Sequence, residues 1–358
     1  MMPITTRTLN APSEEAIHAY YNGMRPFWHP VIRSEDLPEG KPVGVELLGE
    51  ELVIVRLDGR AVALQDLCRH FQARLSLGEV VEHDGVQCLM CPYHGWAYDE
   101  SGQCVYIPQL APGREIPREA RVPRFLTEER YGLVWVCLEE TPRFDIPAFP
   151  ELGDDAFHAG PLRVYDPWAA SAPRIVMGAL DDTHFPWVHP GLLGERSNVA
   201  PPDHKVWREG QYLIARYTVV QPRNVSTADL SDEGNGAGSD GEVITYTNYV
   251  GMPNTIRLVK DSRSGRYVIW LATSPNRYNR TTTFWRVARN YDRNPANDPQ
   301  YEDFEDRVRA QDKPIVESQR PWLLPPFWTK LELPLRPADL PLIEYQKWLE
   351  ELGISVGL

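Results

Sequence analysis

The sequence predicts an α+β protein in which a small all-β unit is followed by a larger unit built on one antiparallel sheet. Three observations predict this fold class. Short apolar stretches alternate with glycine turns in the first part of the chain, longer strand-like stretches fill the second, and helical patterns are confined to a few segments. The 358 residues are 42% hydrophobic and 24% charged, which suits two globular domains.

The first part of the chain begins with a helix and continues with strands. We expect Ser13–Met24 to be helical, because Ser13 can cap a first turn that carries Glu14 and Glu15. The apolar stretches that we predict to be strands are Pro42–Leu48, Glu51–Leu57, Ala61–Leu64, Val86–Met90 and Tyr131–Leu138. The glycines that separate them are Gly59, Gly78, Gly85 and Gly102.

A stretch rich in proline and acidic residues, 141–160, is expected to link the two units. The strands predicted after it are Arg163–Trp168, Val206–Gln221, Glu242–Val250, Thr255–Val259, Arg266–Ser274 and Thr281–Asn290. The helical segments predicted there are Ile175–Val188, which meets Pro186, Asp303–Gln319 and Glu344–Leu352. Asp229–Gly241 is almost free of apolar residues and is expected to be a mobile surface loop.

Composition excludes some functions and leaves others open. The net charge of −13 disfavours nucleic acid as a partner, because an acidic chain repels phosphate backbones. No signal peptide is expected in residues 1–22, and Tyr131–Leu138 is too short to span a membrane. We therefore expect a cytoplasmic protein without a membrane partner. Five cysteines, an odd number, indicate metal binding or core packing rather than a disulfide framework.

Two short segments each offer one thiolate and one imidazole. They are Cys68-Arg69-His70 and Cys91-Pro92-Tyr93-His94-Gly95-Trp96. Two such loops can hold two irons bridged by sulfides, with the cysteines on one iron and the histidines on the other. A structural zinc site is the alternative, and Cys88 and Cys91 also form a C-x-x-C pair.

The sequence of the second loop specifies more than two metal ligands, because Pro92, Tyr93, Gly95 and Trp96 surround them. The segment from Cys68 to Trp96 resembles the Rieske [2Fe-2S] domain. That domain repeats a C-x-H loop and a C-P-Y-H-G-W loop, and Leu75–Gly78 between the two loops also matches. The resemblance implies that Cys68, His70, Cys91 and His94 bind the cluster. Cys88, Cys104 and Cys137 are then expected to be buried core thiols.

A second candidate metal site lies in Asp181-Asp182-Thr183-His184-Phe185-Pro186-Trp187-Val188-His189. An unbroken helix would turn His184 and His189 apart, whereas a break at Pro186 can bring both imidazoles to one point. Two histidines and one carboxylate form the facial triad of oxygen-activating ferrous enzymes. The D-x-x-H-x-x-x-x-H pattern resembles the mononuclear iron site of Rieske oxygenases, and the likeness extends through Pro190, Gly191 and Gly194.

The third ligand must come from elsewhere, and acidic residues crowd Glu302–Glu317. Composition alone does not separate them. Gln311–Gln319 resembles the late helix of the Rieske oxygenases, whose first acid binds iron, and this implies Asp312 as the ligand. Asp306 is the alternative, while Glu317 is expected to face elsewhere on the helix.

The resemblance gives Asp181 a different role. In the family this carboxylate lies between the two metal centres across a subunit boundary and accepts hydrogen bonds from a cluster histidine and an iron-ligating histidine. Such an acid orients imidazoles and raises their basicity. The three-residue spacing to His184 favours Asp181 over the adjacent Asp182.

The resemblance covers nearly the whole chain, including Phe27–Val31 and Tyr131–Trp135. It identifies the chain as the oxygenase (α) component of a Rieske non-heme iron oxygenase, with short stretches most like methylxanthine N-demethylases and vanillate-type O-demethylases. It implies an N-terminal helix packed with the catalytic domain (1–26), a Rieske domain (27–140), a linker (141–160) and a helix-grip catalytic domain (161–358). It also implies a ring-shaped homotrimer.

The implied reaction uses O2 at a mononuclear Fe(II) to hydroxylate or oxidatively demethylate a small aromatic or heterocyclic compound, as in aromatic catabolism. Electrons are expected from NAD(P)H through a separate ferredoxin or flavin reductase, because the chain has no G-x-G-x-x-G and no plant-type four-cysteine spacing. A cis-dihydroxylating dioxygenase and a non-catalytic Rieske electron carrier are the alternatives. Candidate pocket residues are Leu192, Leu193, Asn248 and Trp285.

Overall fold

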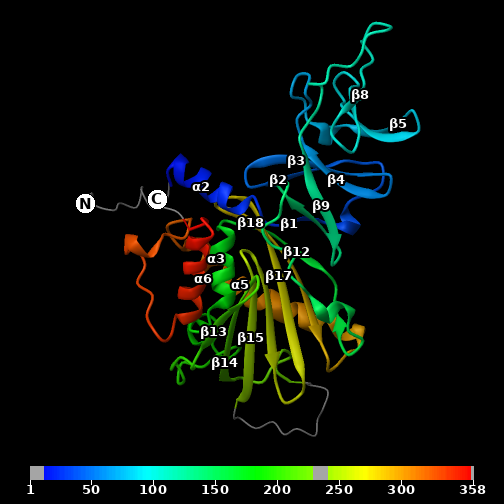
Figure 1. The fold of residues 1–358 in the computed structure, drawn as a ribbon. Coiled ribbons are helices and arrows are strands. Elements are labelled where there is room, and N and C mark those ends of the chain that lie inside the picture. Colours follow the sequence, from blue (N-terminus) through cyan, green and yellow to red (C-terminus); the bar gives the residue numbers. More distant parts are fainter. Residues whose placement is uncertain (1–11, 229–240, 356–358) are drawn as a thin grey trace. The chain divides into compact units, whose positions relative to one another are not determined.

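The computed structural model describes residues 12–228 and 241–355. The predicted surface loop Asp229–Gly241 lies, apart from Gly241, outside the described residues. The chain divides into two compact units, one formed by Arg25–Asp145 and the other by Ile146–Leu358 with the N-terminal segment up to Met24. Helices and mostly antiparallel strands confirm the predicted α+β class (Figure 1).

The Arg25–Asp145 unit contains two antiparallel sheets. The larger has the strand order β1-β10-β9-β4-β3-β2 and the smaller has the order β5-β6-β7-β8. The strands are β1 (His29–Arg33), β2 (Val43–Leu47), β3 (Glu50–Leu57), β4 (Arg60–Gln65), β5 (Glu79–His83), β6 (Val86–Met90), β7 (Ala97–Tyr98), β8 (Cys104–Tyr106), β9 (Arg124–Arg130) and β10 (Leu133–Cys137). Alternate apolar residues of β3, including Val53 and Val55, form one core with Leu89 and Tyr98 of the smaller sheet.

The other unit is built on one eight-stranded sheet. Its order is β11-β18-β17-β16-β15-β14-β13, and β12 also pairs with β18. The strands are β11 (His158–Ala159), β12 (Arg163–Trp168), β13 (Lys205–Glu209), β14 (Tyr212–Gln221), β15 (Glu242–Gly251), β16 (Thr255–Asp261), β17 (Arg266–Arg277) and β18 (Arg280–Arg289). Every pairing is antiparallel, as predicted.

The helices of this unit are α2 (Glu14–Met24), α3 (Ala172–Leu180), α4 (Phe185–Val188), α5 (Asp298–Ser318) and α6 (Leu340–Glu351). The backbone amide of Ala16 donates to the hydroxyl of Ser13, so Ser13 caps α2 as predicted. Helix α3 packs beside both α5 and α6 (Figure 1). None of the helices in the described residues combines the length and apolar character that a membrane crossing requires.

Two sequence predictions of secondary structure were wrong. Val206–Gln221 is not one strand but the hairpin β13–β14, in which Glu209 pairs with Tyr212 around a turn where Gly210 has a φ of 56°. Ile175–Val188 is interrupted between Leu180 and Phe185, ahead of Pro186, and the proline lies in the first turn of α4, where it needs no hydrogen-bond donor.

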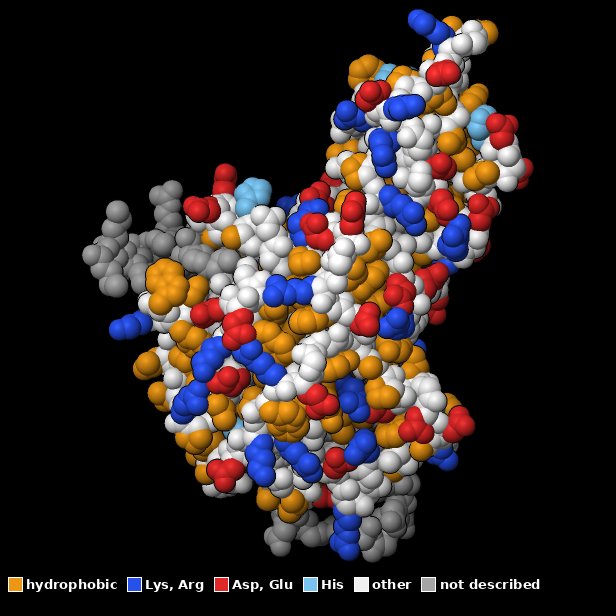
Figure 2. Space-filling model, viewed as in Figure 1, with side chains coloured by type: hydrophobic (Ala, Val, Ile, Leu, Met, Phe, Trp, Pro, Cys, Tyr) orange, Lys and Arg blue, Asp and Glu red, His pale blue; other side chains and the backbone are white. Residues whose placement is uncertain are grey.

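Residues 146–160, within the range predicted as a linker, are held by side chains of the eight-stranded sheet. The backbone amide of Ala148 donates to the hydroxyl of Tyr212, and the buried Glu151 forms an ion pair with Arg257. On the visible molecular face, acidic and basic side chains are interspersed (Figure 2).

Candidate metal centres

The two cysteine–histidine loops are tight turns closed by their own backbone. In the first loop the amide of Cys68 donates to the carbonyl of Ala73 at 2.8 Å, and the amide of Gln72 donates back to Cys68 at 2.9 Å. In the second loop the amide of Cys91 donates to the carbonyl of Trp96 at 2.8 Å. Each loop therefore presents its thiol and imidazole from a short, hydrogen-bonded frame.

The hairpin β5–β6 connects the loops and brings them close. A Cβ on Gly78 would lie 2.0 Å from the carbonyl oxygen of Met90, so only glycine fits where the segment before β5 passes the end of β6. Asp66 accepts hydrogen bonds from the backbone amide and the hydroxyl of Ser76, both at 2.6 Å. These contacts tie the first loop to the start of the hairpin.

The donor atoms of the two loops fit a Rieske cluster. The thiols of Cys68 and Cys91 are buried, and the rings of His70 and His94 lie 4.6 Å apart between centroids. The Nδ1 atoms of both histidines are buried, and within the described part of the chain neither has a hydrogen-bond partner. A buried polar atom without a partner is costly, and iron bound at Nδ1 would remove that cost.

Tyr98 was missed by sequence reasoning. Its hydroxyl lies 3.1 Å from the sulfur of Cys68 and accepts the backbone amide of Arg69 at 3.1 Å, which leaves its own proton for the sulfur. Hydrogen bonds to cluster sulfurs set the reduction potential. Its position two residues after the second loop is the signal that could have pointed to it.

The second metal site begins where α3 ends. After Leu180 the backbone becomes extended at Asp181, and the single turn of α4 then runs from Phe185 to Val188. His184 immediately precedes this turn and His189 immediately follows it. The interruption that brings the histidines together therefore precedes Pro186, contrary to the prediction of a break at the proline itself.

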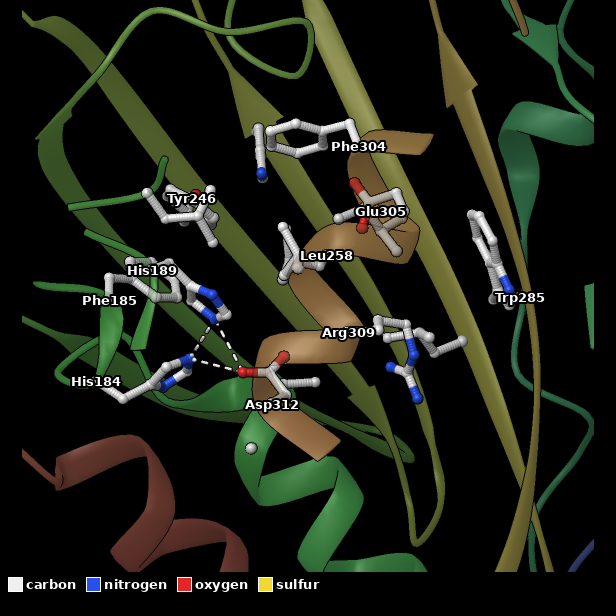
Figure 3. A pocket seen from close by; sticks show the side chains of 17 residues that line it. His184, Phe185, His189, Tyr246, Leu258, Trp285, Phe304, Glu305, Arg309 and Asp312 are labelled. Carbon is white, nitrogen blue, oxygen red and sulfur yellow. Dashed lines mark hydrogen bonds and ion pairs between the residues drawn. The ribbon is translucent and has the colours of Figure 1, made fainter. Parts of the chain in front are cut away.

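Three ligand atoms converge at this point, and Figure 3 shows their side chains facing one another. The Nε2 atoms of His184 and His189 are 3.2 Å apart, and Asp312 Oδ1 lies 2.9 Å from His189 Nε2 and 3.6 Å from His184 Nε2. All three atoms lie within 4.8 Å of one another. The sequence-predicted carboxylate Asp312 thus meets the two histidines.

The far side of each imidazole determines which nitrogen faces the site. His184 Nδ1 donates to Asp181 Oδ2 at 3.0 Å, and His189 Nδ1 donates to Gln311 Oε1 at 2.7 Å. Both Nε2 lone pairs then point at Asp312, and three electron-pair donors this close are stable around a cation. The donor set fits a ferrous ion.

Gln311 is the second residue that sequence reasoning missed, although it directly precedes Asp312. For His184, burial lowers the pKa, but the hydrogen bond and charge of Asp181 outweigh burial and raise it. For Asp181, burial raises the pKa, and the His184 hydrogen bond outweighs it, so the pKa is lowered. Asp181 is therefore held as a carboxylate, hydrogen-bonded to the imidazole of His184.

The neighbouring acids have other partners. Asp182, the residue most easily confused with Asp181, accepts a hydrogen bond from the buried His204 at 2.8 Å. Asp306, the alternative third ligand, accepts hydrogen bonds from Arg163 and from Tyr165. Glu317 accepts the backbone amide of residue 169 at 2.9 Å.

A cavity adjoins the three ligand atoms and shares His184, His189 and Asp312 among its lining residues. Alternation along the strands directs one set of side chains into it. From the sheet come Tyr246, Leu258, Lys260, Ile269, Leu271 and Trp285. Of the predicted pocket residues, Leu193 and Trp285 line the cavity, whereas Leu192 and Asn248 are not among its lining residues.

Helix α5 supplies the opposite wall of this cavity, with Phe304, Glu305 and Arg309 (Figure 3). Burial lowers the pKa of Lys260 to about 8 and raises the pKa of Glu305. The walls are otherwise mostly aromatic and aliphatic. The lining therefore suits the apolar faces of an aromatic ring.

Comparisons with known proteins agree with this arrangement. The Rieske [2Fe-2S] domain matches residues 27–126, and the vanillate O-demethylase oxygenase C-terminal domain matches residues 168–353. The chain is 33% identical to methylxanthine N1-demethylase NdmA of Pseudomonas putida, across 92% of this chain and 89% of the relative. It is 32% identical to methylxanthine N3-demethylase NdmB of the same species, across 93% and 90%.

Solved structures show the same fold. The structure of Pseudomonas putida CBB5 NdmA superimposes with a TM-score of 0.77 at 31% identity, covering 94% of this chain and 92% of the other. Dicamba monooxygenase bound to dicamba gives a TM-score of 0.70 at 19% identity, covering 92% and 97%, which shows the fold alone.

The fold and the two sites define an oxygenase that joins an iron–sulfur cluster to a mononuclear iron. The chain belongs to the Rieske non-heme iron oxygenases, as the oxygenase component, and is homologous to the methylxanthine N-demethylase oxygenases. Its cofactors are a Rieske [2Fe-2S] cluster and a mononuclear iron, with O2 as co-substrate. It acts on a small aromatic or heterocyclic molecule with separate electron-transfer partners.

Proposed function

We propose that this oxygenase removes a methyl group from a nitrogen or oxygen atom of a small aromatic or heterocyclic substrate. Two relatives that match more than nine tenths of the chain are N-demethylases, and they support this reaction over cis-dihydroxylation. One oxygen atom of O2 enters a methyl C–H bond, and the methyl carbon leaves as formaldehyde. The other oxygen atom leaves as water, and NAD(P)H supplies two electrons.

The observation that carries the proposal is the continuity of the cavity with the triad. His184, His189 and Asp312 line the same cavity as Leu258 and Trp285. A substrate in this space has its reacting carbon beside the place where iron would be held. Positioning a methyl group there is the condition for oxidising it rather than another part of the molecule.

We assign His184, His189 and Asp312 as the ligands that would hold the mononuclear iron. Bound iron supplies the activation of O2. The side chains do the rest. Asp181 and Gln311 hold the Nδ1 protons of the two histidines and keep each Nε2 lone pair directed at the ligand set. The apolar walls exclude bulk water and align the substrate.

We assign Cys68, His70, Cys91 and His94 as the cluster ligands. The exposed rings of Phe71 and Tyr93 flank the two histidines, with ring centroids 4.1 Å from His70 and 3.8 Å from His94 respectively. This histidine edge suits electron transfer to a neighbouring subunit. Asp181 of that neighbour would then receive a hydrogen bond from His70 or His94.

The proposed assembly is a homotrimer. Its domains are an N-terminal helix packed with the catalytic domain (1–26), a Rieske domain (27–140), a linker (141–160) and a catalytic domain (161–358). A separate ferredoxin or flavin reductase brings electrons from NAD(P)H. We also propose a cytoplasmic location, supported by five cysteines of which none forms a disulfide in the described residues, since reducing compartments disfavour disulfides.

Single-turnover chemistry tests the proposed reaction. Holoenzyme with a reduced cluster is incubated anaerobically with methylated aromatic and heterocyclic compounds and then exposed to O2. We expect formaldehyde and a product lighter by one methylene unit in mass spectrometry. A product that keeps its methyl group and gains two oxygen atoms would instead establish cis-dihydroxylation.

A further inference from the structure

Arg309 is a buried cation on the wall of the cavity. It lies on α5, one turn before Asp312, and its side chain lines the same space. The residue is only 8% exposed. Its guanidinium carbon lies 4.7 Å from the ring centroid of Tyr165 and 4.5 Å from that of Trp168. These rings stabilise the positive charge but offer no lone pair to the guanidinium N–H groups.

The hydrogen-bonding capacity of Arg309 is unused. Its Nε and Nη2 atoms are buried without a partner, and within the described part of the chain Arg309 forms no ion pair. The indole nitrogen of Trp285, which lines the same cavity, is also buried and has no partner. Three donor nitrogens, which carry four N–H groups, therefore lack acceptors, and a buried donor left unsatisfied is unfavourable.

The carboxylates nearest to Arg309 in the sequence are engaged elsewhere. Glu305 accepts a hydrogen bond from a buried tyrosine hydroxyl at 3.1 Å, and its charge acts on the buried Lys260. Asp312 directs its Oδ1 at the two histidines. Asp306 receives hydrogen bonds from Arg163. Glu305, Asp306 and Asp312 favour the charge of Arg309 from a distance, but none of them forms an ion pair with its guanidinium within the described residues.

We propose that Arg309, with the indole N–H of Trp285, forms a subsite for a carboxylate of the substrate. The proposal rests on the demethylase function and narrows its substrate to a methylated aromatic or heterocyclic carboxylate. The guanidinium is always charged and can donate two parallel hydrogen bonds to the two oxygens of one carboxylate.

The spacing along α5 agrees with this substrate class. Residues three apart on a helix share one face, with Cβ atoms about 5–6 Å apart, so Arg309 and Asp312 address neighbouring parts of one ligand. Figure 3 shows His184 and His189 on one side of α5 and Trp285 on the other. A ring with its methyl-bearing atom at the triad can therefore direct a carboxylate toward Arg309.

A charged oxygen group fits better than a neutral one. A neutral carbonyl can accept a hydrogen bond from one of these donors, but it places no negative charge beside the buried guanidinium of Arg309. Removing or omitting one partner of a buried ion pair is strongly unfavourable. The subsite therefore selects an anion over a neutral compound of the same shape.

The test compares two probes of nearly the same shape, the anion 4-methoxybenzoate and the neutral amide 4-methoxybenzamide. Isothermal titration calorimetry on anaerobic holoenzyme measures the Kd of each. We expect the carboxylate to bind about 10- to 100-fold more tightly than the amide, as hydrogen bonds to charged groups imply. Equal binding, or tighter binding of the amide or of caffeine, would overturn the subsite.

Matched variants identify the residue responsible. Arg309→Gln should bring the ratio of the two dissociation constants close to one, whereas Arg307→Gln, an exposed arginine on the same helix, should keep the wild-type ratio. A preserved ratio in Arg309→Gln would also overturn the subsite. If thermal denaturation shows that Arg309→Gln is unfolded, Arg309→Lys takes its place. Lysine keeps the charge but lacks the two parallel N–H donors of the guanidinium, so the ratio must be reduced.

Iron analysis on the same preparations separates the two proposals. Holoenzyme with mononuclear iron, formaldehyde production from a methylated compound and no preference for the carboxylate would remove the subsite and leave the demethylase. Absence of formaldehyde from every methylated compound, with the carboxylate preference present, would remove the demethylase and leave an anion site.

Discussion

The two metal sites of this protein are built in opposite ways. The proposed cluster site takes all four donors from two loops between Cys68 and His94, and one hairpin joins them. The proposed iron site joins two histidines at the ends of one helical turn to a carboxylate on α5, and the neighbouring contact between His189 and Gln311 spans 122 positions. The first site depends on local backbone and the second on tertiary packing.

This difference explains what each site requires of its surroundings. The cluster loops keep their shape through backbone hydrogen bonds within six residues of chain and through Gly78, which permits their close approach. The iron site keeps its shape only while α3, α4 and α5 pack together. A change in a cluster ligand should therefore act on that site alone, and a change on α5 should act on iron without touching the cluster.

The largest expected effect is at the cluster. Cys91→Ala removes one of only two thiolates and should abolish the visible absorption and the Rieske electron paramagnetic resonance signal. Cys88→Ala should retain both, because Cys88 is a buried thiol on β6. Absorption that survives loss of Cys91 but not of Cys88 would show that the loop is assigned incorrectly.

The next effect separates the two sites. His184→Ala and Asp312→Ala should lower iron from about three to about two per chain, keep the cluster signal and abolish turnover. Asp306→Asn is the matched control on α5 and should retain three, since Asp306 is bonded to Arg163 and Tyr165. Mononuclear iron retained in Asp312→Ala would move the third ligand to another acid.

Asp181→Asn sharpens the comparison, because both metals should stay bound. Loss of the charge that orients His184 should lower turnover by about 10- to 100-fold, or more where electron transfer also fails. Reduction of the cluster by dithionite should be unchanged. Asp303→Asn, an exposed acid on α5, serves as the control. Near-normal turnover in Asp181→Asn would refute the proposed bridging role of Asp181.

Gln311→Ala should have a smaller effect than Asp181→Asn, because a neutral amide holds the Nδ1 proton of His189 more weakly than a carboxylate would. We expect about a tenfold loss of iron affinity, measured by competition with a chelator. The exposed Gln300 on the same helix provides the control variant Gln300→Ala. Unchanged affinity in Gln311→Ala would exclude an orienting role.

The smallest effect is expected at Tyr98, where both cofactors and the fold remain. Tyr98→Phe removes the hydroxyl 3.1 Å from the sulfur of Cys68 and should lower the cluster reduction potential, because that hydrogen bond favours the reduced form. Tyr93→Phe, an exposed position, should leave the potential unchanged. Protein-film voltammetry measures both, and equal potentials would contradict the contact.

Local patterns predicted the parts of the fold that depend on local chemistry. Arg163–Trp168 and Val86–Met90 are strands with the predicted limits, because β-branched and apolar residues end at clear turn signals. The hairpin β13–β14 was predicted as one strand, since its alternation continues on both sides of Gly210 and a single glycine does not reveal a turn. The early end of α3 was missed because it depends on tertiary contacts. Asp181 and Asp182 accept hydrogen bonds from His184 and His204, and only the folded chain brings these groups together.

The candidate site shows the same limit. Cys68, His70, Cys91 and His94 follow from contiguous motifs, and so do His184 and His189. Asp312 was preferred over Asp306 as the third ligand only because of the resemblance to the late helix of the Rieske oxygenases. Both acids lie on the same helix, and only packing determines where each side chain points. Arg309 could not be recognised at all, since the significance of an arginine without a partner exists only in the folded cavity.

Metal and sulfide analysis of the purified chain, together with electron paramagnetic resonance, tests the central claim of two separate iron sites most directly. The protein should be red-brown, contain about three irons and two labile sulfides per chain, and give a Rieske-type signal when reduced. A colourless protein with one zinc per chain would contradict the cluster site, and two irons with two sulfides would contradict the mononuclear site.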